Sequence, residues 1–183
     1  MRITDKYVFF FSAKDEFSNW YLSSFIEPLA PKYNNSITSS VEFTCVEQYM
    51  MWRKACLFYD YNIASSILTG DLRYTGEKEQ AYYKRLGRLV KDYDEATWTS
   101  LREKIVKRGL YLKYTQNEDL KNKLIAYADK EFVEASPYDS IYGIKMGMWD
   151  RDVENKDCWK GQNLLGKWHT DLAVYLKAQS DIS

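Results

Sequence analysis

The sequence predicts a helix-rich α+β fold, in which a single domain over residues 1–183 contains a small β-sheet. Two segments have the aromatic and β-branched residues typical of strands, KYVFFF at 6–11 and SVEFT at 40–44. From Val46 onward, apolar residues recur at helical spacing instead. The length suits one well-buried domain, and neither a fixed-period repeat nor a Pro/Gly-rich linker divides it.

Periodicity and capping residues predict the remaining elements in chain order. Asp94 and Asn117 are each placed as the N-cap of a helix, and KEFVEAS at 130–136 returns to strand character. The last helix carries one apolar stripe, made of Leu164, Leu165, Trp168, Leu172 and Leu176. We expect helices over 46–58, 62–69, 77–92, 95–109, 117–128 and 163–178. We expect loops at the three prolines, Pro28, Pro31 and Pro137.

Composition limits the class of protein and its partners. The 26 basic residues equal the 26 acidic ones, so no global field attracts nucleic acid or an anionic membrane, although a local basic pocket is compatible with this balance. Three cysteines without C-x-x-C spacing indicate neither a disulfide framework nor a zinc site. The apolar run from Tyr7 to Phe11 is too short for a signal peptide or a membrane span. We therefore expect a cytoplasmic monomer without a metal, cofactor or membrane partner.

The segment VEQYMMWRKACLF places an acid and a lysine on one face of a predicted helix. Glu47 and Lys54 are seven residues apart, which leaves them about 20° apart in azimuth and about 10.5 Å apart along the axis. Met51 and Phe58 lie on the same stripe, and ionisable groups in apolar surroundings have shifted pKa values. Two simpler interpretations stay open. Glu47 can form a capping box with Thr44, and Lys54 can be a surface residue whose stem packs along the core.

Two later segments carry further polar candidates. VEASPYDSIYGI runs from a strand into a turn at Ser136, where Asp139 either presents its carboxylate at a pocket rim or makes an Asx turn. WKGQNLLGKW puts Gly161 and Asn163 where a helix starts. The free amides there suit an anion such as phosphate, while ordinary capping by Asn163 explains the same residues.

Two earlier segments add candidate binding groups. EFSNWYLSSF combines Ser18, Asn19 and Trp20 in a predicted loop, and hydrogen-bonding groups beside aromatic rings occur both in nucleobase or sugar pockets and in surface loops. Gly87 lies inside a predicted helix, where glycine costs roughly 1 kcal/mol relative to alanine, so we expect close packing or a ligand approach there. Arg88 beside it is suited to pairing with a phosphate.

The chain resembles the NADAR family, also called YbiA-like, in six blocks that occur in the family's order: FSNWYLSSF, VEQYMMWRKACLF, RLGRLVKDYDEATW, KYTQNEDLKNKL, VEASPYDSIYGI and WKGQNLLGKW. The resemblance covers about Phe9 to Leu176. It implies a mostly helical α+β domain with its ligand in a central cleft. It further implies an N-glycosidase that removes ADP-ribose from modified guanine, with nucleic acid as the carrier of the substrate. The alternatives are hydrolysis of phosphorylated ribosylamino intermediates of riboflavin synthesis, non-catalytic binding of ADP-ribose or NAD, and an interaction domain without nucleotide affinity.

The resemblance places eight residues in the matching blocks, namely Glu47, Lys54, Asp139, Gly143, Trp159, Gly161, Asn163 and Gly166. The chemistry of the side chains suggests their roles. Lys54 is the predicted nucleophile that forms a Schiff base with C1 of the ribose, and Glu47 and Asp139 are the predicted acid and base, in either order. The predicted substrate-binding residues are Ser18, Asn19, Trp20, Arg88, Ser136, Tyr142, Gly143, Trp159, Gly161 and Asn163. Tyr142 stands where the family commonly has tryptophan. Lys145 and Trp149 lie in a segment that is usually rich in glycine.

Overall fold

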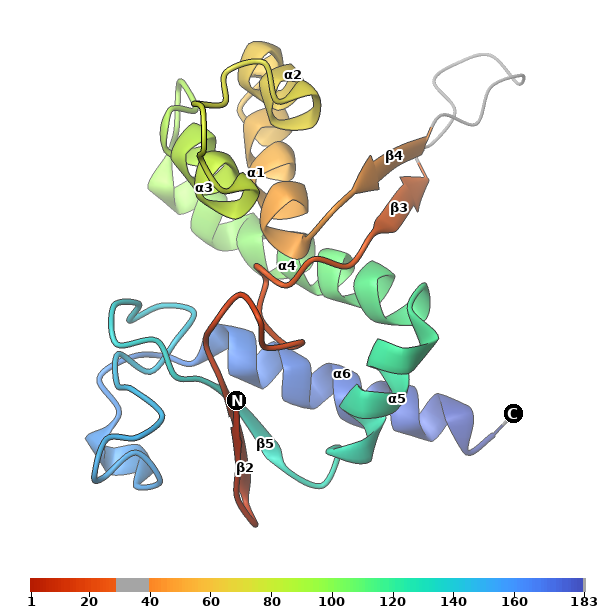
Figure 1. The fold of residues 1–183 in the computed structure, drawn as a ribbon, viewed down its shortest axis with the longest axis vertical. Coiled ribbons are helices and arrows are strands. Elements are labelled where there is room, and N and C mark those ends of the chain that lie inside the picture. The colour runs from red at the N-terminus through yellow and green to blue at the C-terminus, as the bar shows by residue number, and fades with distance from the viewer. Residues whose placement is uncertain (29–39, 183) are drawn as a thin grey trace. The chain divides into compact units, whose positions relative to one another are not determined.

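The computed structural model describes residues 1–28 and 40–182 and contains helices and short strands in mixed order (Figure 1). The predicted helix-rich α+β class is confirmed, with two small sheets instead of one. The chain forms two compact units, of which the first comprises Met1–Tyr21 and Asn117–Ser183 and the second comprises Leu22–Gln116. A single domain over the whole chain stays a prediction. Within the described ranges, no helix is both long enough and apolar enough to cross a bilayer.

The second unit is built around helix α1 (Val46–Leu57). Helices α2 (Tyr61–Thr69), α3 (Glu79–Arg88) and α4 (Glu95–Thr115) each pack against α1 (Figure 1). Because it has neighbours on several sides, α1 is buried from Val46 through Trp52 without a break. A helix buried on several faces lacks one clear apolar stripe, which explains why polar residues of α1 are enclosed along with apolar ones.

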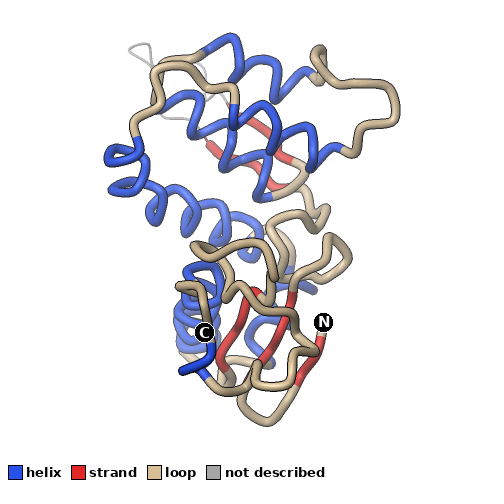
Figure 2. The backbone as a smooth tube through the Cα atoms, turned by 90° about the vertical axis from the view of Figure 1, so that its left-hand side faces the viewer, coloured by secondary structure: helices blue, strands red, loops and turns tan. Residues whose placement is uncertain are grey.

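A β-hairpin completes the second unit, visible as paired red segments in Figure 2. Strand β3 (Phe25–Pro28) pairs antiparallel with β4 (Ser40–Phe43). The rings of Phe25 and Phe43 lie 5.9 Å apart at the end of the hairpin nearest α1. The strand predicted at 40–44 is thus confirmed, whereas the loop predicted at Pro28 is wrong, because this proline is the last residue of β3. Pro31 lies outside the described residues.

The first unit contains a three-stranded sheet in the order β1-β2-β5. β1 (Arg2–Ile3) pairs antiparallel with β2 (Tyr7–Phe10), and β2 pairs in parallel with β5 (Glu131–Glu134). All four residues of β2 are buried, as expected for a strand covered on both faces. Helix α6 (Leu164–Ser180) packs against β5, and α5 (Glu118–Ala126) packs against α6 (Figure 1).

The six predicted helices are found in the predicted order among the described residues. α3 and α4 depart most from their predicted lengths, and α3 covers Glu79–Arg88 rather than 77–92. Asp94 caps α4 as predicted, since its carboxylate accepts a 2.7 Å hydrogen bond from the amide of Thr97. α4 runs on to Thr115 instead of ending at 109. Gly109 serves packing there, because a Cβ on it would lie 2.7 Å from the ring of Tyr49. A glycine inside a helix is compatible with such a close approach.

Candidate functional site

Lys54 is half-buried on α1 with its amine held by groups from elsewhere in the second unit. Its Nζ donates a 2.8 Å hydrogen bond to the carbonyl oxygen of Gly87 on α3. The same nitrogen lies 4.1 Å from the ring centre of Tyr93 and 5.7 Å from that of Trp98. One face of the amine is therefore covered by aromatic rings, an arrangement that attracts a cation and excludes water.

The surroundings of Lys54 shift its pKa. Burial lowers the pKa of Lys54, and the negative charges of Glu95 and Glu47 oppose this change by smaller amounts. This direction agrees with the shifted pKa expected for an ionisable group in apolar surroundings, one of the interpretations that the sequence left open for Lys54. Tyr93 supplies no opposing charge, since burial and its hydrogen bond to Glu95 raise the pKa of its phenol to about 12.

Gly87 lies close to α1 because it has no side chain. A Cβ on Gly87 would lie 1.9 Å from Sδ of Met51 and 2.9 Å from its Cγ. The close packing expected at this glycine is confirmed. It brings the backbone of α3 against α1 and places the carbonyl of Gly87 within hydrogen-bonding distance of Lys54.

Glu47 is buried at the start of α1, and the alternative of a capping box with Thr44 as the N-cap is wrong. The N-cap of α1 is Cys45 rather than Thr44. Gln48, one position after Glu47, accepts hydrogen bonds from the amide and the hydroxyl of Thr44 at 2.7 and 3.2 Å. The amide that Glu47 was expected to satisfy is therefore satisfied by Gln48, and the position of Glu47 needs another explanation than capping.

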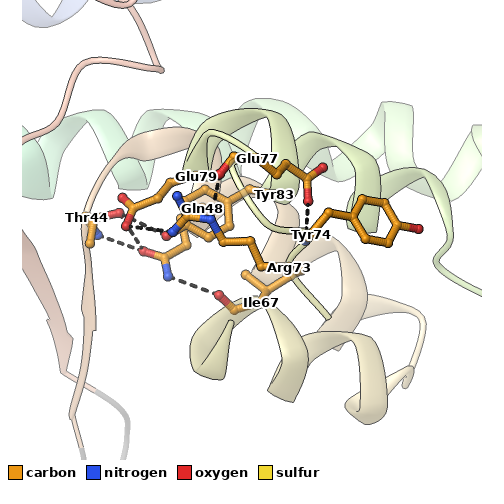
Figure 3. A network of polar contacts seen from close by, with 8 residues as sticks. All are labelled: Thr44, Gln48, Ile67, Arg73, Tyr74, Glu77, Glu79 and Tyr83. Carbon is orange, nitrogen blue, oxygen red and sulfur yellow. Dashed lines mark hydrogen bonds and ion pairs between the residues drawn. The ribbon is translucent and has the colours of Figure 1, made fainter. Parts of the chain in front are cut away.

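Figure 3 shows how Gln48 fixes the start of α1 to its neighbours. Its Nε2 donates to the carbonyl of Ile67 on α2 at 3.2 Å, while the hydroxyl of Thr44 lies 3.3 Å from that of Tyr83 on α3. Gln48 is itself buried, so these bonds are shielded from competing water. The network sets the position of α1 relative to α2 and α3.

The loop before α3 is held by a second set of bonds in the same view. Nε of Arg73 donates to the carbonyl of Glu77 at 2.7 Å, and its Nη1 lies 3.3 Å from the carboxylate of Glu79 (Figure 3). Glu77 in turn accepts from the amide of Tyr74 at 3.2 Å. These contacts involve exposed groups, so they order the loop more than they stabilise the fold.

Asp139 makes the Asx turn that the sequence left open. Its Oδ1 accepts hydrogen bonds from the amides of Ile141 and Tyr142, each at 2.8 Å. Ser136 closes the same turn from the other side, with its hydroxyl accepting from the amide of Asp139 at 3.2 Å. The turn after β5 is thus fixed by its own side chains.

Asn163 occupies the N-cap position of α6, yet its side chain does not cap the helix. Its Oδ1 accepts from the amide of Glu134 at 3.0 Å, and its Nδ2 donates to the carbonyl of Phe132 at 3.1 Å. The residue is fully buried with φ of 53°, a left-handed conformation that asparagine tolerates. The capping predicted for the side chain is therefore wrong, and Asn163 joins the start of α6 to β5.

The structure brings the blocks VEASPYDSIYGI and WKGQNLLGKW together within the first unit. The amide of Asn163 donates to the carbonyl of Gly143 at 3.1 Å, and a Cβ on Gly161 would lie 2.2 Å from that oxygen. A Cβ on Gly166 would lie 2.3 Å from the carbonyl of Phe132. These glycines allow backbone segments to touch, and their predicted contacts with substrate stay predictions.

The aromatic members of the predicted binding set also have packing contacts. Nε1 of Trp159 donates to the carbonyl of Val153 at 2.7 Å, and its ring lies 5.9 Å from that of Tyr7. The ring of Tyr142 lies 6.0 Å from that of Trp168 in an edge-on arrangement. Trp159 and Tyr142 are half-buried, so part of the surface of each remains accessible.

The predicted loop at residues 18–20 is confirmed. The hydroxyl of Ser18 accepts from the amide of Trp20 at 3.1 Å. Oδ1 of Asn19 is buried and meets no hydrogen-bond donor among residues 1–28 and 40–182. Arg88 is exposed at the last position of α3. Lys54, Glu47 and Arg88 belong to the second unit, and the other predicted site residues belong to the first.

Four residues around Lys54 and Glu47 were missed by sequence reasoning, namely Gln48, Tyr93, Glu95 and Trp98. Three of them, Tyr93, Glu95 and Trp98, lie in RLGRLVKDYDEATW. The sequence predicted a role in this block for Gly87 and Arg88 alone. The signal available was a pair of aromatic residues on either side of a helix N-cap. Their approach to Lys54 depends on how α3 and α4 fold back onto α1, which local spacing does not encode.

Comparisons with known proteins cover nearly the whole chain. The sequence profile of the NADAR domain matches residues 9–174. The chain is 36% identical over 172 residues to N-glycosidase R617 of Acanthamoeba polyphaga mimivirus, covering 90% of this chain and 92% of the relative. It is 34% identical over 169 residues to Protein irg-1 of Caenorhabditis elegans, covering 90% of this chain and 76% of the relative.

A solved structure shares the fold. The NMR structure of the E. coli protein YbiA superposes with a TM-score of 0.65 at 22% identity, over 99% of this chain and 88% of YbiA. The predicted YbiA-like fold is confirmed by this likeness. Together with the profile match and the two relatives, the order of the six sequence blocks shows that the chain belongs to the NADAR domain family.

Proposed function

We propose that this chain is an N-glycosidase that hydrolyses the N-glycosidic bond of an ADP-ribosyl or phosphoribosyl compound, and specifically that it removes ADP-ribose from modified guanine in nucleic acid. Membership of the NADAR family and the relative named N-glycosidase R617 support the glycosidase class. The observation that carries the proposal is the environment of Lys54, where burial lowers the pKa of a primary amine that lies against two aromatic rings.

A neutral amine is a nucleophile, whereas an ammonium group is not. In the proposed reaction, Nζ of Lys54 attacks C1 of the ribose and the bond from C1 to the leaving nitrogen breaks. The electron pair of that bond stays on the leaving nitrogen, which takes a proton from an acid. Nζ then loses a proton to a base, the bond from C1 to the ring oxygen opens with protonation of that oxygen, and a Schiff base forms between C1 and Nζ.

Water completes the reaction. It adds to C1, proton transfers convert Nζ into a leaving amine, and the sugar is released, so that one water is consumed for each N-glycosidic bond cleaved. General acid and base groups typically contribute 10²- to 10⁴-fold to such steps. Glu47, on the same face of α1 as Lys54, is one proposed carboxylate. Asp139, whose Oδ1 is engaged by the turn, stays the other predicted carboxylate.

Borohydride trapping tests the nucleophile directly. Incubation with a guanine oligonucleotide carrying ADP-ribose, followed by reduction, should leave a mass adduct on the peptide that contains Lys54. Lys54→Arg keeps a positive charge but cannot form a Schiff base, so it should give neither adduct nor product. Lys78→Arg, an exposed lysine at the N-cap of α3, is the matched control and should behave as the wild type. Undiminished turnover in Lys54→Ala would refute the assignment.

A non-catalytic module that binds ADP-ribose or NAD is the second candidate, and two contacts of Lys54 favour it. The hydrogen bond to Gly87 and the ring of Tyr93 also suit a protonated lysine that only holds helices together. This candidate predicts tight binding by calorimetry with no product after long incubation. A substrate panel of ADP-ribosylated guanine oligonucleotide, NAD, ADP-ribosylated peptide and ribosylamino pyrimidine phosphate, read by mass spectrometry, separates the candidates and identifies the leaving group.

A further inference from the structure

A second region of the molecule has the properties of a ligand site. A cleft of about 650 Å³ opens in the second unit beside α1, β3 and α4, a volume within the range of small-molecule sites. Its described lining includes three cations, Arg53, Lys104 and Arg108, and one carboxylate, Glu27. The rest of the lining is largely aromatic and aliphatic.

The cleft lies on a different face of α1 from Lys54. Arg53 is one residue before Lys54 and so lies about 100° away in azimuth, while Cys56, two residues after it, lies about 200° away. Arg53 and Cys56 both line the cleft, whereas Lys54 does not. A ligand in this cleft would therefore not occupy the surroundings of the proposed nucleophile.

The one carboxylate of the cleft is already engaged. Glu27 is buried and lies 2.9 Å from Nη2 of Arg108, and it accepts a 2.8 Å hydrogen bond from the hydroxyl of Tyr49. Its charge and that of Arg108 compensate each other. Arg53 and Lys104 therefore give the cleft an excess of positive charge.

Arg53 also has a donor in need of an acceptor. Its Nε is buried, and no residue within 1–28 or 40–182 accepts a hydrogen bond from it. A buried guanidinium nitrogen without an acceptor is unfavourable, and a small movement of the half-buried Arg53 side chain would let a ligand oxygen accept from it. Lys104 is exposed on α4 on the same cleft, where its ammonium is available to the same anion.

Tyr59 adds a flat surface to the cleft. It follows the C-cap of α1 with φ of 57°, in the left-handed position where helix ends favour glycine. A tyrosine there carries a conformational cost, and its side chain is 77% exposed instead of being buried in compensation. An exposed ring beside an excess of positive charge is suited to stacking with a nucleobase.

We infer that this cleft binds a nucleotide, with a phosphate paired to Arg53 and Lys104 and the base stacked on Tyr59. The shared chemistry is a phosphate joined to a flat ring, and it is offered both by a free nucleotide and by one nucleotide of a single-stranded nucleic acid. Arginine and lysine are the usual partners of phosphate oxygens in both. The inference does not depend on the reactivity of Lys54.

Calorimetric titration tests the inference with three probes, namely AMP, adenosine and inorganic phosphate. AMP should saturate a site on the wild type with an affinity that falls as salt increases, and it should bind about tenfold more tightly than adenosine or phosphate alone. A short single-stranded oligonucleotide forms a fourth arm. Tighter binding of the oligonucleotide than of AMP identifies nucleic acid as the source of the ligand, and the reverse identifies a free nucleotide.

Matched charge variants locate the binding. Lys104→Glu should weaken AMP binding about tenfold, while Lys107→Glu, on the same helix but outside the cleft lining, should change it less than about twofold. Arg53→Met and Tyr59→Ala should weaken it as Lys104→Glu does. Circular dichroism melting checks each variant for folding, and the surface change at Lys104 keeps the test valid if Arg53→Met unfolds.

Three results would overturn the inference. They are absence of saturable AMP binding, equal loss in Lys104→Glu and Lys107→Glu, and an affinity for phosphate equal to that for AMP. Loss of the borohydride adduct on Lys54 with AMP binding retained would instead count against the proposed glycosidase mechanism alone. The two proposals therefore fail independently.

Discussion

The carbonyl oxygen of Gly87 accepts a 2.8 Å hydrogen bond from Nζ of Lys54, although the two residues are 33 positions apart in the chain. The bond joins α3 to α1 at the point where the sulfur of Met51 fills the space that a side chain at 87 would take. Helix packing and the placement of a reactive amine therefore depend on the same small residue.

Replacing Gly87 with alanine tests this dependence. The added Cβ would lie 1.9 Å from Sδ of Met51, so the helices must separate or Met51 must move. Overpacking outweighs the gain in helix propensity, and we expect the free energy of unfolding to fall by about 1–2 kcal/mol. Urea unfolding measures it. In a Met51→Ala background the same change should be neutral or stabilising, and an equal loss in both backgrounds would contradict the packing explanation.

Activity should rise with pH through the titration of Lys54. Because burial lowers the pKa of Lys54, the neutral amine becomes abundant below the pH at which an ordinary lysine titrates. The logarithm of kcat/KM should increase with pH and level off above the lowered pKa. A profile that falls steadily with rising pH across this range would exclude a neutral Lys54 as the nucleophile.

The free energy of unfolding should also depend on pH through the titration of Lys54. Between the lowered folded-state pKa of Lys54 and its ordinary unfolded-state pKa, the unfolded chain binds more protons, so stability rises with pH across this window. The stability gained when Lys54 is neutral is lost as the pH falls through the folded-state pKa of Lys54. Urea unfolding at a series of pH values should show this rise in the wild type and a weaker one in Lys54→Met.

Glu95 offers a way to change the pKa of Lys54 without touching the lysine. Its negative charge is the larger of the two that raise the pKa of Lys54, so Glu95→Gln should lower that pKa further and move the rise in kcat/KM to lower pH. The shift should shrink in high salt, because Glu95 is exposed. Glu103→Gln, on the same helix, is the control and should leave the profile where it is.

Asn163→Asp should destabilise the first unit. Aspartate keeps an acceptor for the amide of Glu134 but loses the donor to the carbonyl of Phe132, and it puts a carboxylate against that oxygen in a buried position. We expect a loss of about 2–4 kcal/mol in urea unfolding. Gln162→Ala, at the exposed neighbouring position, should stay within about 0.5 kcal/mol. Equal stability of the two variants would contradict the bridging function of Asn163.

Sequence periodicity predicted the shared face of Glu47 and Lys54 because it depends only on helix geometry. Periodicity did not predict the elements whose extent depends on tertiary contacts. Strand β3 was missed because FIEP has an acid and a proline, and its pairing with β4 is what makes it a strand. The expected end of α4 coincided with Gly109, a residue common at helix ends, whereas Tyr49 explains the glycine.

In the candidate site, too, local sequence predicted some features, and tertiary contacts determine the others. The apolar neighbours of Lys54 on α1 made a shifted pKa one of two possibilities. The rings of Tyr93 and Trp98 that lie against its amine come from beyond a turn whose direction the sequence does not specify. Asn163 was correctly placed at the start of a helix. Its hydrogen bonds to β5 depend on which strand lies beneath that helix, so sequence spacing could not reveal them.

The group that anchors Lys54 belongs to the main chain, and this limits how substitution can act on it. No amino-acid change at position 87 deletes a carbonyl oxygen, so mutational tolerance there should follow side-chain volume and be insensitive to polarity. A saturation library at position 87 should therefore rank variants by size, with serine close to alanine and valine below both.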